Sequence, residues 1–413
     1  MADQDVARRE WAETGAPDWR RDPLGFLIAP LSAEDFYRDY YEQRPLLTAR
    51  SEPLRYADML TVAALDQFFD SADLRDGMVD VASQQVQIER DTLFDRDGRA
   101  RLNAIAAEYL NGATLIFPHL HESMAELGEF CRALEAVFSA HVQTNIYLTP
   151  QRKAEGERNQ GFPIHYDNHD VFVLQISGSK AWNFYGAPVT IPYRGEAFQV
   201  GRHDPGEITE SFTLKPGDCV YVPRGLMHEA PNVGDEPSLH ITVGLITKTW
   251  ADLVLESVSE LALAESAFRR SLPPGFARRD FDRDAAEKTF AGLTAMIADR
   301  ATFDASFDLL ADTFLRERRP KLSGVIAATP DVPRAGDQYR RRPLVPWQLA
   351  DDEGQVVLVG PGGDLAFDEA EAKAVEMALS GQAFAVDDLP AADPTQLFRR
   401  LWAGGYLEKV GEG

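Results

Sequence analysis

The sequence predicts an α+β chain in which helical segments precede and follow a central β-barrel or double-sheet jelly roll. From about residue 142 to residue 247, short apolar strands alternate with turns rich in Gly and Pro. Such regular spacing is typical of all-β sandwiches and barrels. On both sides of this region, apolar residues recur at helical spacing. In addition, all eight histidines lie between residues 119 and 240, which indicates chemistry within the β region.

Composition and length restrict the class of protein. A chain of 413 residues is long for one core and suggests two or three domains. Hydrophobic residues make up 44 % of the chain, which argues against general disorder. No apolar run reaches the length of a membrane span, and the charged N-terminus lacks the apolar core of a signal peptide. Cys131 and Cys219 are too few for a disulfide framework. We therefore expect a cytoplasmic protein with no membrane partner.

The formal net charge is −24. A field of this sign repels the phosphates of nucleic acids and favours basic partners. Many acidic proteins carry such a charge for solubility alone, so both explanations remain open. The charge does weigh against direct binding of DNA or RNA.

The N-terminal part begins with a charged segment, residues 1–24, that we expect to be a flexible leader. Ser32-Ala-Glu-Asp35 resembles a capping box and predicts a helix running to Tyr41, which Pro45 ends. Residues 58–70 and 120–140 also carry helical periodicity.

The β region is predicted to contain six strands, separated by turns such as Lys215-Pro-Gly-Asp218. These strands are Val142–Thr149, Val171–Ile176, Ala181–Tyr185, Phe212–Leu214, Cys219–Val222 and His240–Thr247.

After Trp250 the pattern becomes helical again, over 250–270, 284–300 and 303–317. The apolar stripes of these helices have nothing in their own domain to cover them, which predicts a homodimer. The tail, 343–413, combines a short strand, a Gly-rich turn and two helices, an order that suits a winged-helix-type module. The expected domains are the leader 1–24, a catalytic domain 25–249, a helical segment 250–325 and a winged-helix-like domain 326–413.

The strongest chemical signal is His165-Tyr-Asp167, together with His228 at the end of a Pro- and Gly-containing run. Residues two apart on an extended segment project from the same face of a strand. With a third ligand from a distant strand they can form a 2-His-1-carboxylate triad, which leaves three positions of an octahedral iron(II) open. Any one of these histidines alone is more simply a surface or core residue, but their clustering favours the triad.

Lys180 gives a second signal, because strand alternation places it on the same face as Trp182. A lysine inside a barrel is costly unless it pairs with an anion. A dicarboxylate cosubstrate would chelate the iron at one end and accept hydrogen bonds at the other from Lys180 and a hydroxyl such as Thr242. The alternative is that Lys180 belongs to a turn and reaches solvent.

Three linked segments resemble the JmjC/cupin-4 ribosomal oxygenases, a family that includes nucleolar histidyl hydroxylases and a bacterial arginyl hydroxylase of ribosomal proteins. The segments are Gly161–Asp167, Val171–Trp182 and Pro216–His228. The resemblance implies a JmjC-type double-stranded β-helix, followed by a helical dimerisation segment and a C-terminal winged helix. It implies an iron(II)- and 2-oxoglutarate-dependent dioxygenase that uses O2 to hydroxylate Arg or His in a basic ribosomal protein.

Carried over residue by residue, the resemblance implies iron ligands at His165, Asp167 and His228. It implies 2-oxoglutarate contacts at Asn145, Lys180 and Thr242, and a substrate contact at Tyr147. Two features depart from the nucleolar enzymes. Residues 151–160 are longer than the corresponding segment, and Gly244 stands where those enzymes have a substrate-binding serine.

His169 is a further histidine close to the expected metal ligands. His169 follows Asp167 by two residues and could face a metal, but the resemblance places a variable residue there, so we interpret it as a rim residue.

Another metal-dependent cupin enzyme would present more His ligands and would not need Lys180. A catalytically inactive scaffold would gain nothing from an intact triad. The substrate protein, and the choice between hydroxylation and demethylation, stay open.

Overall fold

The computed structural model describes residues 18–84, 87–151, 159–232, 234–328, 333–334, 336–352 and 354–411. The chain forms two compact units, Met1–Thr247 and Lys248–Gly413, here called the barrel unit and the C-terminal unit. Residues 1–17 of the expected leader lie outside the described residues. Trp19, which also belongs to that segment, is buried and packs edge-on against Phe130 at 5.6 Å between ring centroids. The described end of the expected leader is therefore part of the fold.

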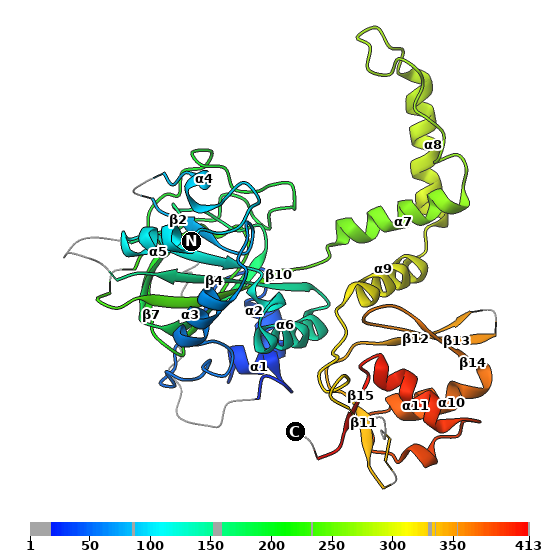
Figure 1. Ribbon diagram of the computed structural model, residues 1–413. Helices are drawn as coiled ribbons and strands as arrows, with labels where there is room; N and C mark the ends of the chain where they lie inside the picture. The colour runs from blue at the N-terminus through cyan, green and yellow to red at the C-terminus, as the bar shows by residue number, and fades with distance from the viewer. Residues whose placement is uncertain are drawn as a thin grey trace. The chain divides into compact units, whose positions relative to one another are not determined.

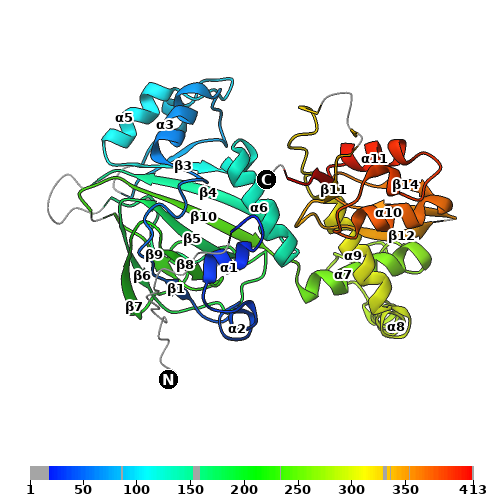
Figure 2. The same ribbon diagram turned by 90° about the horizontal axis from the view of Figure 1, so that it is seen from below.

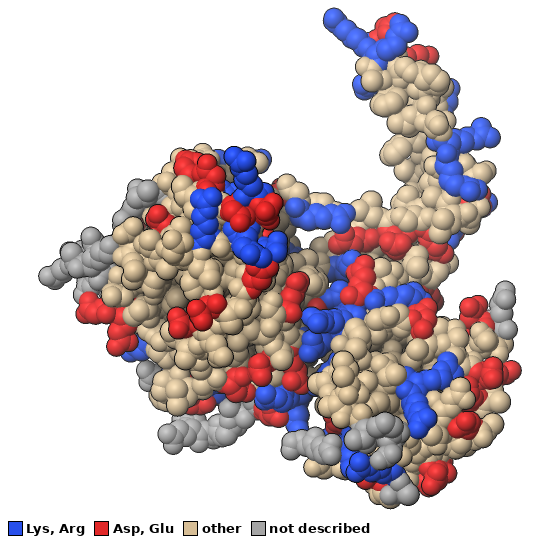
Figure 3. Space-filling view, viewed as in Figure 1, with Lys and Arg blue, Asp and Glu red and all other residues tan. Residues whose placement is uncertain are grey.

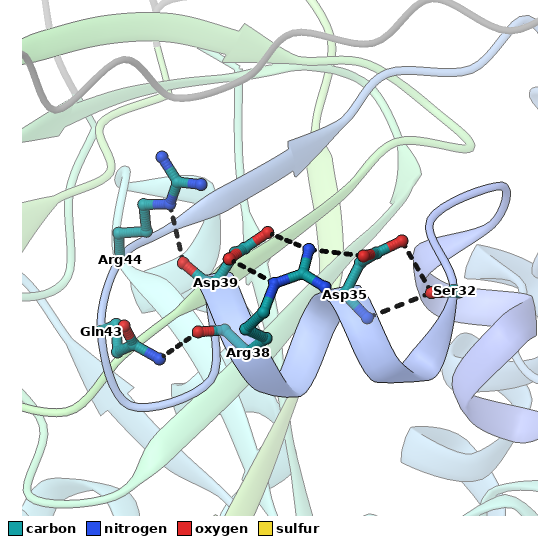
Figure 4. Close-up of polar contacts among 6 residues, drawn as sticks. All are labelled: Ser32, Asp35, Arg38, Asp39, Gln43 and Arg44. Carbon is teal, nitrogen blue, oxygen red and sulfur yellow. Dashed lines mark hydrogen bonds and ion pairs between the residues drawn. The ribbon is translucent and has the colours of Figure 1, made fainter.

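Short helices surround the sheets of the barrel unit (Figures 1 and 2). The predicted helix after Ser32 is present, and the Ser32 hydroxyl accepts a hydrogen bond from the Asp35 N–H at 3.1 Å. Arg38 lies between Asp35 and Asp39 and pairs with both carboxylates (Figure 4). The helices are α1 (Pro23–Ile28), α2 (Ala33–Asp39), α3 (Val62–Ser71), α4 (Arg90–Leu93), α5 (Leu102–Leu110), η1 (Leu120–Glu122) and α6 (Ala125–Phe138).

The described residues of this unit form ten strands in two antiparallel sheets. The larger sheet has the order β1-β8-β5-β10-β4-β3-β2, and the smaller has the order β7-β6-β9. This confirms the predicted double-sheet jelly roll. The strands are β1 (Leu46–Thr48), β2 (Asp80–Ala82), β3 (Thr114–Pro118), β4 (His141–Thr149), β5 (Asp170–Ser177), β6 (Lys180–Phe184), β7 (Glu210–Leu214), β8 (Cys219–Val222), β9 (His228–Glu229) and β10 (Ser238–Ile246).

The alternation along β5 explains the layers. Phe172 and Leu174 join a core cluster with residues of α1, α2 and α6, on the outer face of the larger sheet. Val171 and Val173 point the other way and pack with Trp182 and other residues of the smaller sheet. Both faces of β5 are therefore buried, and the space between the two sheets can hold a site.

All six predicted strands are present, with ends that differ by no more than two residues. The prediction missed β1, β2, β3 and β9, which have three, three, five and two residues. Strands this short show too few alternations to be recognised, and the first four residues of β3 are buried on both faces. Of these strands, β3 and β2 extend the larger sheet beyond β4, and β3 brings Thr114 beside the barrel interior.

A buried ion-pair network ties the N-terminal segment to two loops of the barrel. Asp170, at the start of β5, accepts hydrogen bonds from the Tyr221 hydroxyl at 2.5 Å and from the Arg224 guanidinium at 2.7 Å. Arg224 also pairs with Glu42 at 2.7 Å. Burial raises the pKa of the Asp170 carboxyl, and its two hydrogen-bond partners oppose that shift. The network fixes both the end of the loop that enters β5 and the loop that follows β8.

The C-terminal unit begins with three helices, of which α8 has no buried residue and projects from the rest of the unit in Figure 1. Its core forms around Tyr339, Phe367 and Phe398. The segment 321–342, which follows these helices, lies partly outside the described residues and contains the strand β11 near its end. The elements are α7 (Trp250–Ala264), α8 (Asp284–Arg300), α9 (Phe303–Glu317), β11 (Tyr339–Arg341), β12 (Gln348–Asp352), β13 (Gln355–Val359), β14 (Leu365–Asp368), η2 (Glu369–Glu371), α10 (Ala372–Leu379), η3 (Val386–Asp388), α11 (Pro394–Ala403) and β15 (Leu407–Lys409).

Two surface properties follow from these elements. Among the described residues, no helix combines the length and the apolar character needed to cross a bilayer. On the face of the barrel unit seen in Figure 3, basic and acidic side chains both occur. The net charge of −24 is therefore not gathered into one acidic surface on that face.

Candidate active site

The barrel unit brings His165, Asp167 and His228 together, although not on the regular strand that the spacing suggested. His165 lies in the connection between β4 and β5 and forms an isolated bridge with His228, the first residue of β9. Asp167 lies outside any strand, and its backbone carbonyl accepts a hydrogen bond from the Gly225 N–H at 2.9 Å. Pro163 cannot donate a ladder hydrogen bond, so this connection cannot continue as a paired strand. The loop is instead held to the segment that carries His228.

The three side chains have the spacing of a metal site. One ligand atom from each lies within 4.8 Å of the other two. The Nε2 atom of His228 is 3.8 Å from an Asp167 carboxylate oxygen, and the two imidazole centroids are 4.6 Å apart. Two imidazoles and one carboxylate can bind one face of a divalent transition metal and leave other positions open.

Hydrogen bonds to the backbone orient both imidazoles. The Nδ1 atom of His165 is 2.8 Å from the Pro163 carbonyl, and that of His228 is 3.0 Å from the Leu226 carbonyl. Because a carbonyl oxygen only accepts, each Nδ1 donates, and each Nε2 keeps its lone pair for a metal. Burial and the neighbouring His165 lower the pKa of His228 to about 4, so this imidazole is neutral near pH 7. The donor set therefore fits a metal ion without further proton loss from His228.

The cluster lies in a pocket between the two sheets with an empty volume of about 580 Å³. The walls combine polar groups with apolar and aromatic ones. The lining residues are Thr114, Tyr147, Gln160, Gly161, Phe162, His165, Asp167, Val171, Val173, Lys180, Trp182, His228, Ala230, His240 and Thr242.

Lys180 points into this pocket and is only 4 % exposed. Its ammonium donates to the Thr149 hydroxyl at 3.2 Å, and no carboxylate of the described residues forms an ion pair with it. Thr149 in turn shares a 3.0 Å hydrogen bond with Thr114. Burial lowers the pKa of Lys180 to about 7. The buried ammonium therefore has one hydroxyl partner, and an anionic ligand in the pocket would supply the opposite charge that it needs.

His240 is a site residue to which the sequence assigned no role. Its imidazole is buried and stacks on Tyr147 at 4.9 Å between centroids, and its Nδ1 atom has no hydrogen-bond partner in the part of the chain that the structure describes. Burial and the neighbouring Lys180 hold the pKa of His240 well below its usual range. The alternation of β10 already placed it on one face with Thr242, which is the signal that could have identified it.

The other predicted contact residues lie on neighbouring strands. In the register of β4 and β10, Tyr147 is opposite His240 and Thr242 is opposite Asn145. Tyr147 and Thr242 line the pocket, whereas Asn145 and Gly244 are not among its lining residues. Gly244 lies two residues beyond Thr242 on the same face of β10, next to Val171 of β5. The predicted extension at residues 151–160 lies largely outside the described residues.

A second group, His119, His121 and Glu122, also has ligand atoms within 4.8 Å of one another. The Nδ1 atom of His121 accepts a hydrogen bond from the Thr144 N–H at 3.2 Å. The neutral ring therefore carries its proton on Nε2, which cannot then bind a metal. We therefore interpret His121 as a structural residue. It accepts the hydrogen bond of the Thr144 N–H, which lies on β4 just outside the part of that strand that pairs with β3.

Comparison with known proteins agrees with this geometry. A model of the JmjC domain family matches residues 119–253, which contain the whole cluster and Lys180. Residues 119–253 form a JmjC domain. The resemblance predicted from the three motifs is thus confirmed for the barrel.

Curated relatives of the JmjC domain are also similar in sequence. The chain is 31% identical over 313 residues to ribosomal oxygenase 1 of Gallus gallus, covering 71% of this chain and 51% of the relative. It is 34% identical over 259 residues to the bifunctional lysine-specific demethylase and histidyl-hydroxylase NO66 of Dictyostelium discoideum, covering 60% of this chain and 49% of the relative. The chain therefore spans about half the length of these relatives.

A solved structure has the same fold. The ribosomal oxygenase YcfD from Escherichia coli, in complex with cobalt and 2-oxoglutarate, superposes with a TM-score of 0.50 at 16% identity. The match covers 92% of this chain and 99% of that chain.

Proposed function

We propose that this chain is an iron(II)- and 2-oxoglutarate-dependent oxygenase that hydroxylates a side chain of a basic polypeptide. One observation carries the proposal. A His-Asp-His cluster and a buried lysine without a carboxylate partner among the described residues line the same pocket. Another metal-dependent cupin has no need of the lysine, and a scaffold has no need of either group.

The residues of the pocket fit both the metal and the cosubstrate. His165, Asp167 and His228 would hold iron(II), and their mixed nitrogen and oxygen donors suit that ion. Lys180 would bind the distal carboxylate of 2-oxoglutarate through a charge-assisted hydrogen bond, with Thr242 and Asn145 as further contacts. When iron, O2 and 2-oxoglutarate are bound, one oxygen atom enters a substrate C–H bond and the other enters succinate, with release of CO2.

The chain itself supplies orientation and exclusion of water. The backbone carbonyls of Pro163 and Leu226 fix the two imidazoles, so the ligands need little rearrangement when the metal binds. Val171, Val173 and Trp182 form an apolar wall that limits access of water to the reacting centre. Tyr147, which lines the pocket, would contact the substrate.

The substrate class rests on the relatives and on charge. Both curated relatives named above carry names of oxygenases or hydroxylases, and one is called a ribosomal oxygenase. With a net charge of −24, the chain favours a basic partner over a nucleic acid. We therefore propose a ribosomal protein as substrate, no direct nucleic-acid partner and a cytoplasmic location.

The test is formation of succinate from 2-oxoglutarate by the purified chain with and without iron(II). A panel of basic ribosomal-protein peptides is then assayed by mass spectrometry for one added oxygen, across a series of salt concentrations. We expect iron-dependent succinate and peptide oxidation that falls with ionic strength. Turnover confined to small metabolites, or insensitive to salt, would contradict a basic polypeptide substrate.

The lowered pKa of Lys180 makes cosubstrate binding depend on pH. The free lysine has a pKa of about 7, and a bound carboxylate raises it because it stabilises the ammonium form. Below pH 7 the lysine is already charged, so this group adds no pH dependence. Above pH 7 binding must take up a proton, and the 2-oxoglutarate KM should rise by up to about tenfold per pH unit.

The proton uptake can be measured directly. Titration calorimetry at pH 8, in two buffers of different ionisation enthalpy, should show uptake of close to one proton per 2-oxoglutarate, and little uptake at pH 6. The same KM at pH 6 and pH 9 would mean that no lysine titrates on binding.

We also propose that the helical segment makes this chain a homodimer. Large apolar side chains remain exposed on α7, α8 and α9, including Trp250 at 78%, Phe290 at 68% and Phe303 at 58%. Burying such a surface against a second copy would stabilise both. Light scattering at micromolar concentration should give twice the chain mass. A Phe290→Asp variant should shift the molecule toward monomer, and a monomeric parent chain would remove the proposal.

The C-terminal unit is proposed to contain the predicted winged-helix-like module. Helices α10 and α11 together with the three-stranded sheet β12-β13-β14 support this assignment. Residues 343–413 carry no excess of basic side chains, so we assign the module to packing or protein contact.

A further inference from the structure

His240 lies where a ligand could reach it, and its own hydrogen bonding is incomplete. It belongs to β10, is 3% exposed and lines the pocket between the two sheets. Its Nδ1 atom has no hydrogen-bond partner among the described residues. Whether Nδ1 carries a proton or a lone pair, it is an unsatisfied polar atom in a buried place. Such an atom costs free energy until a ligand or a water molecule completes it.

Two aromatic rings hold the imidazole of His240. It stacks on Tyr147, with 4.9 Å between the ring centroids and 9° between the ring planes. Trp182, from the facing sheet, meets it edge to face at 6.3 Å. Packing therefore fixes the plane of the ring before any ligand binds, so that a ligand loses little free energy in ordering it.

The charge beside His240 indicates which kind of ligand would complete it. Lys180 lines the same pocket, and its positive charge acts on the imidazole. Burial and this charge hold the pKa of His240 well below its usual range, so the ring is neutral near pH 7 and carries one N–H. A neutral N–H close to an ammonium group suits a ligand with negatively charged acceptor atoms.

The pocket also offers more donors than the chain satisfies. An ammonium group has three N–H donors, and that of Lys180 bonds only the Thr149 hydroxyl among the described residues. The indole N–H of Trp182, another lining residue, has no partner in the described part of the chain either. Asp167 is the one carboxylate among the described lining residues, and it belongs to the metal cluster. A ligand with several acceptor oxygens would use donors that the chain leaves open.

We propose that His240 is a cosubstrate-binding residue, whose N–H donates to the distal carboxylate of 2-oxoglutarate beside the Lys180 ammonium. The inference rests on the proposed function and adds to it a residue and a rule of selection. Two donors, one charged and one neutral, can each bind one of the two oxygens of that carboxylate. The pocket therefore selects its ligands by the distal carboxylate, and succinate, which retains this group, is held by the same two residues.

The test compares ligands with and without a distal carboxylate. 2-Oxoglutarate and succinate carry it, whereas 2-oxopentanoate has a methyl group in its place on the same five-carbon chain. Each ligand is titrated into wild-type and variant protein loaded with cobalt(II). The dissociation constant is obtained from the rise of the unfolding temperature with ligand concentration. This measurement needs neither turnover nor a polypeptide substrate.

His240→Phe keeps a ring that can stack on Tyr147 and removes both nitrogen atoms. The affinities for 2-oxoglutarate and succinate should fall by about tenfold or more, as expected for the loss of one hydrogen bond to a charged group. The affinity for 2-oxopentanoate should change by less than about twofold, because a methyl group accepts no hydrogen bond. His240→Gln, which restores an N–H donor, should regain part of the loss.

His141→Phe is the matched control, because His141 is exposed at the start of β4 and is not among the lining residues. It should leave the three affinities unchanged. If the larger ring prevents folding of His240→Phe, His240→Leu takes its place. In the absence of ligand, neither variant of His240 should unfold at a lower temperature than wild type, since each removes a buried polar atom that lacks a partner.

A structural role of His240 predicts a different result. Gln175 is opposite His240 in the register of β5 and β10, and its Oε1 atom also lacks a partner among the described residues. If His240 served this residue instead of a ligand, His240→Phe would unfold at a lower temperature without ligand and would bind the three ligands equally well or equally badly relative to wild type. That combination would overturn the inference.

Unchanged affinity for 2-oxoglutarate in His240→Phe would show that the ring nitrogen meets only water, and equal losses in His240→Phe and His240→Gln would show that no donated hydrogen bond is involved. Either result overturns the inference. The proposed function fails separately. If wild-type protein binds 2-oxoglutarate and His240→Phe binds it equally well, the cosubstrate stands and the role of His240 falls. If wild-type protein loaded with cobalt(II) binds no 2-oxoglutarate at all, the proposed function itself is wrong.

Discussion

Asp167→Ala is expected to abolish iron-dependent turnover of 2-oxoglutarate, with a loss of more than about a hundredfold, and to leave the fold intact. The carboxylate supplies one of only three protein ligands in the cluster, so its removal leaves two imidazoles on the metal. Loss of outer partners of metal ligands already costs about 10–100-fold, and loss of a ligand should cost at least as much. The Asp167 side chain is 30% exposed, so no buried charge is left without a partner and the unfolding temperature should change little.

The measurement combines succinate formation with binding of iron(II) or cobalt(II) to the cosubstrate-free protein. Asp66→Ala is a matched control, since Asp66 lies exposed on α3 and the variant has the same change in charge. The control should keep full metal binding. Near-normal succinate production by Asp167→Ala would refute the assignment of the triad.

Lys180→Met should raise the KM for 2-oxoglutarate by about two to four orders of magnitude, the equivalent of about 3–5 kcal/mol for breaking a buried ion pair. Methionine is unbranched like lysine and only one atom shorter, and it removes the charged ammonium group with its hydrogen-bond donors. In the cosubstrate-free protein, the same change removes a buried ammonium whose hydrogen-bond partner is the Thr149 hydroxyl. The variant should therefore unfold at a higher temperature than wild type when 2-oxoglutarate is absent.

The variant is thus expected to bind 2-oxoglutarate more weakly and yet to be more stable without it, a combination that a merely structural role of Lys180 would not produce. Lys215→Met serves as the control, because Lys215 is exposed in the turn after β7 and should affect neither quantity. An unchanged KM in Lys180→Met would show that the lysine does not bind the cosubstrate. A lower unfolding temperature without 2-oxoglutarate would show that Lys180 has a structural partner.

Local patterns in the sequence were sufficient for much of the barrel. Strands β4, β5, β6, β8 and β10 are long or apolar enough for their alternation to be read directly, and the structure confirms them. The same alternation placed Lys180 and Trp182 on one face of β6, and both line the pocket. The spacing of His165 and Asp167 pointed to a shared ligand position, although these residues lie in a loop. The face of a strand from which a side chain projects depends only on its position along that strand, so it does not depend on which strands pair with it.

Contacts between segments far apart in the chain could not be obtained in this way. Thr114 contacts Thr149 only because β3 pairs with β4. The sequence of β3 lacks the alternation of polar and apolar residues from which a strand could be predicted. The tautomers of His165 and His228 depend on the backbone carbonyls of Pro163 and Leu226, whose directions are set by the loops.

The sequence by itself thus determined the jelly-roll class, the three metal-binding candidates and the inward lysine, because each follows from periodicity or from spacing over a few residues. The tertiary structure alone decided that Lys180 has no carboxylate partner among the described residues, that His240 is buried beside it, and that His169 fills the space over Gly244. These facts depend on which side chains of distant strands and loops share one volume. That is settled by packing, which no local pattern encodes.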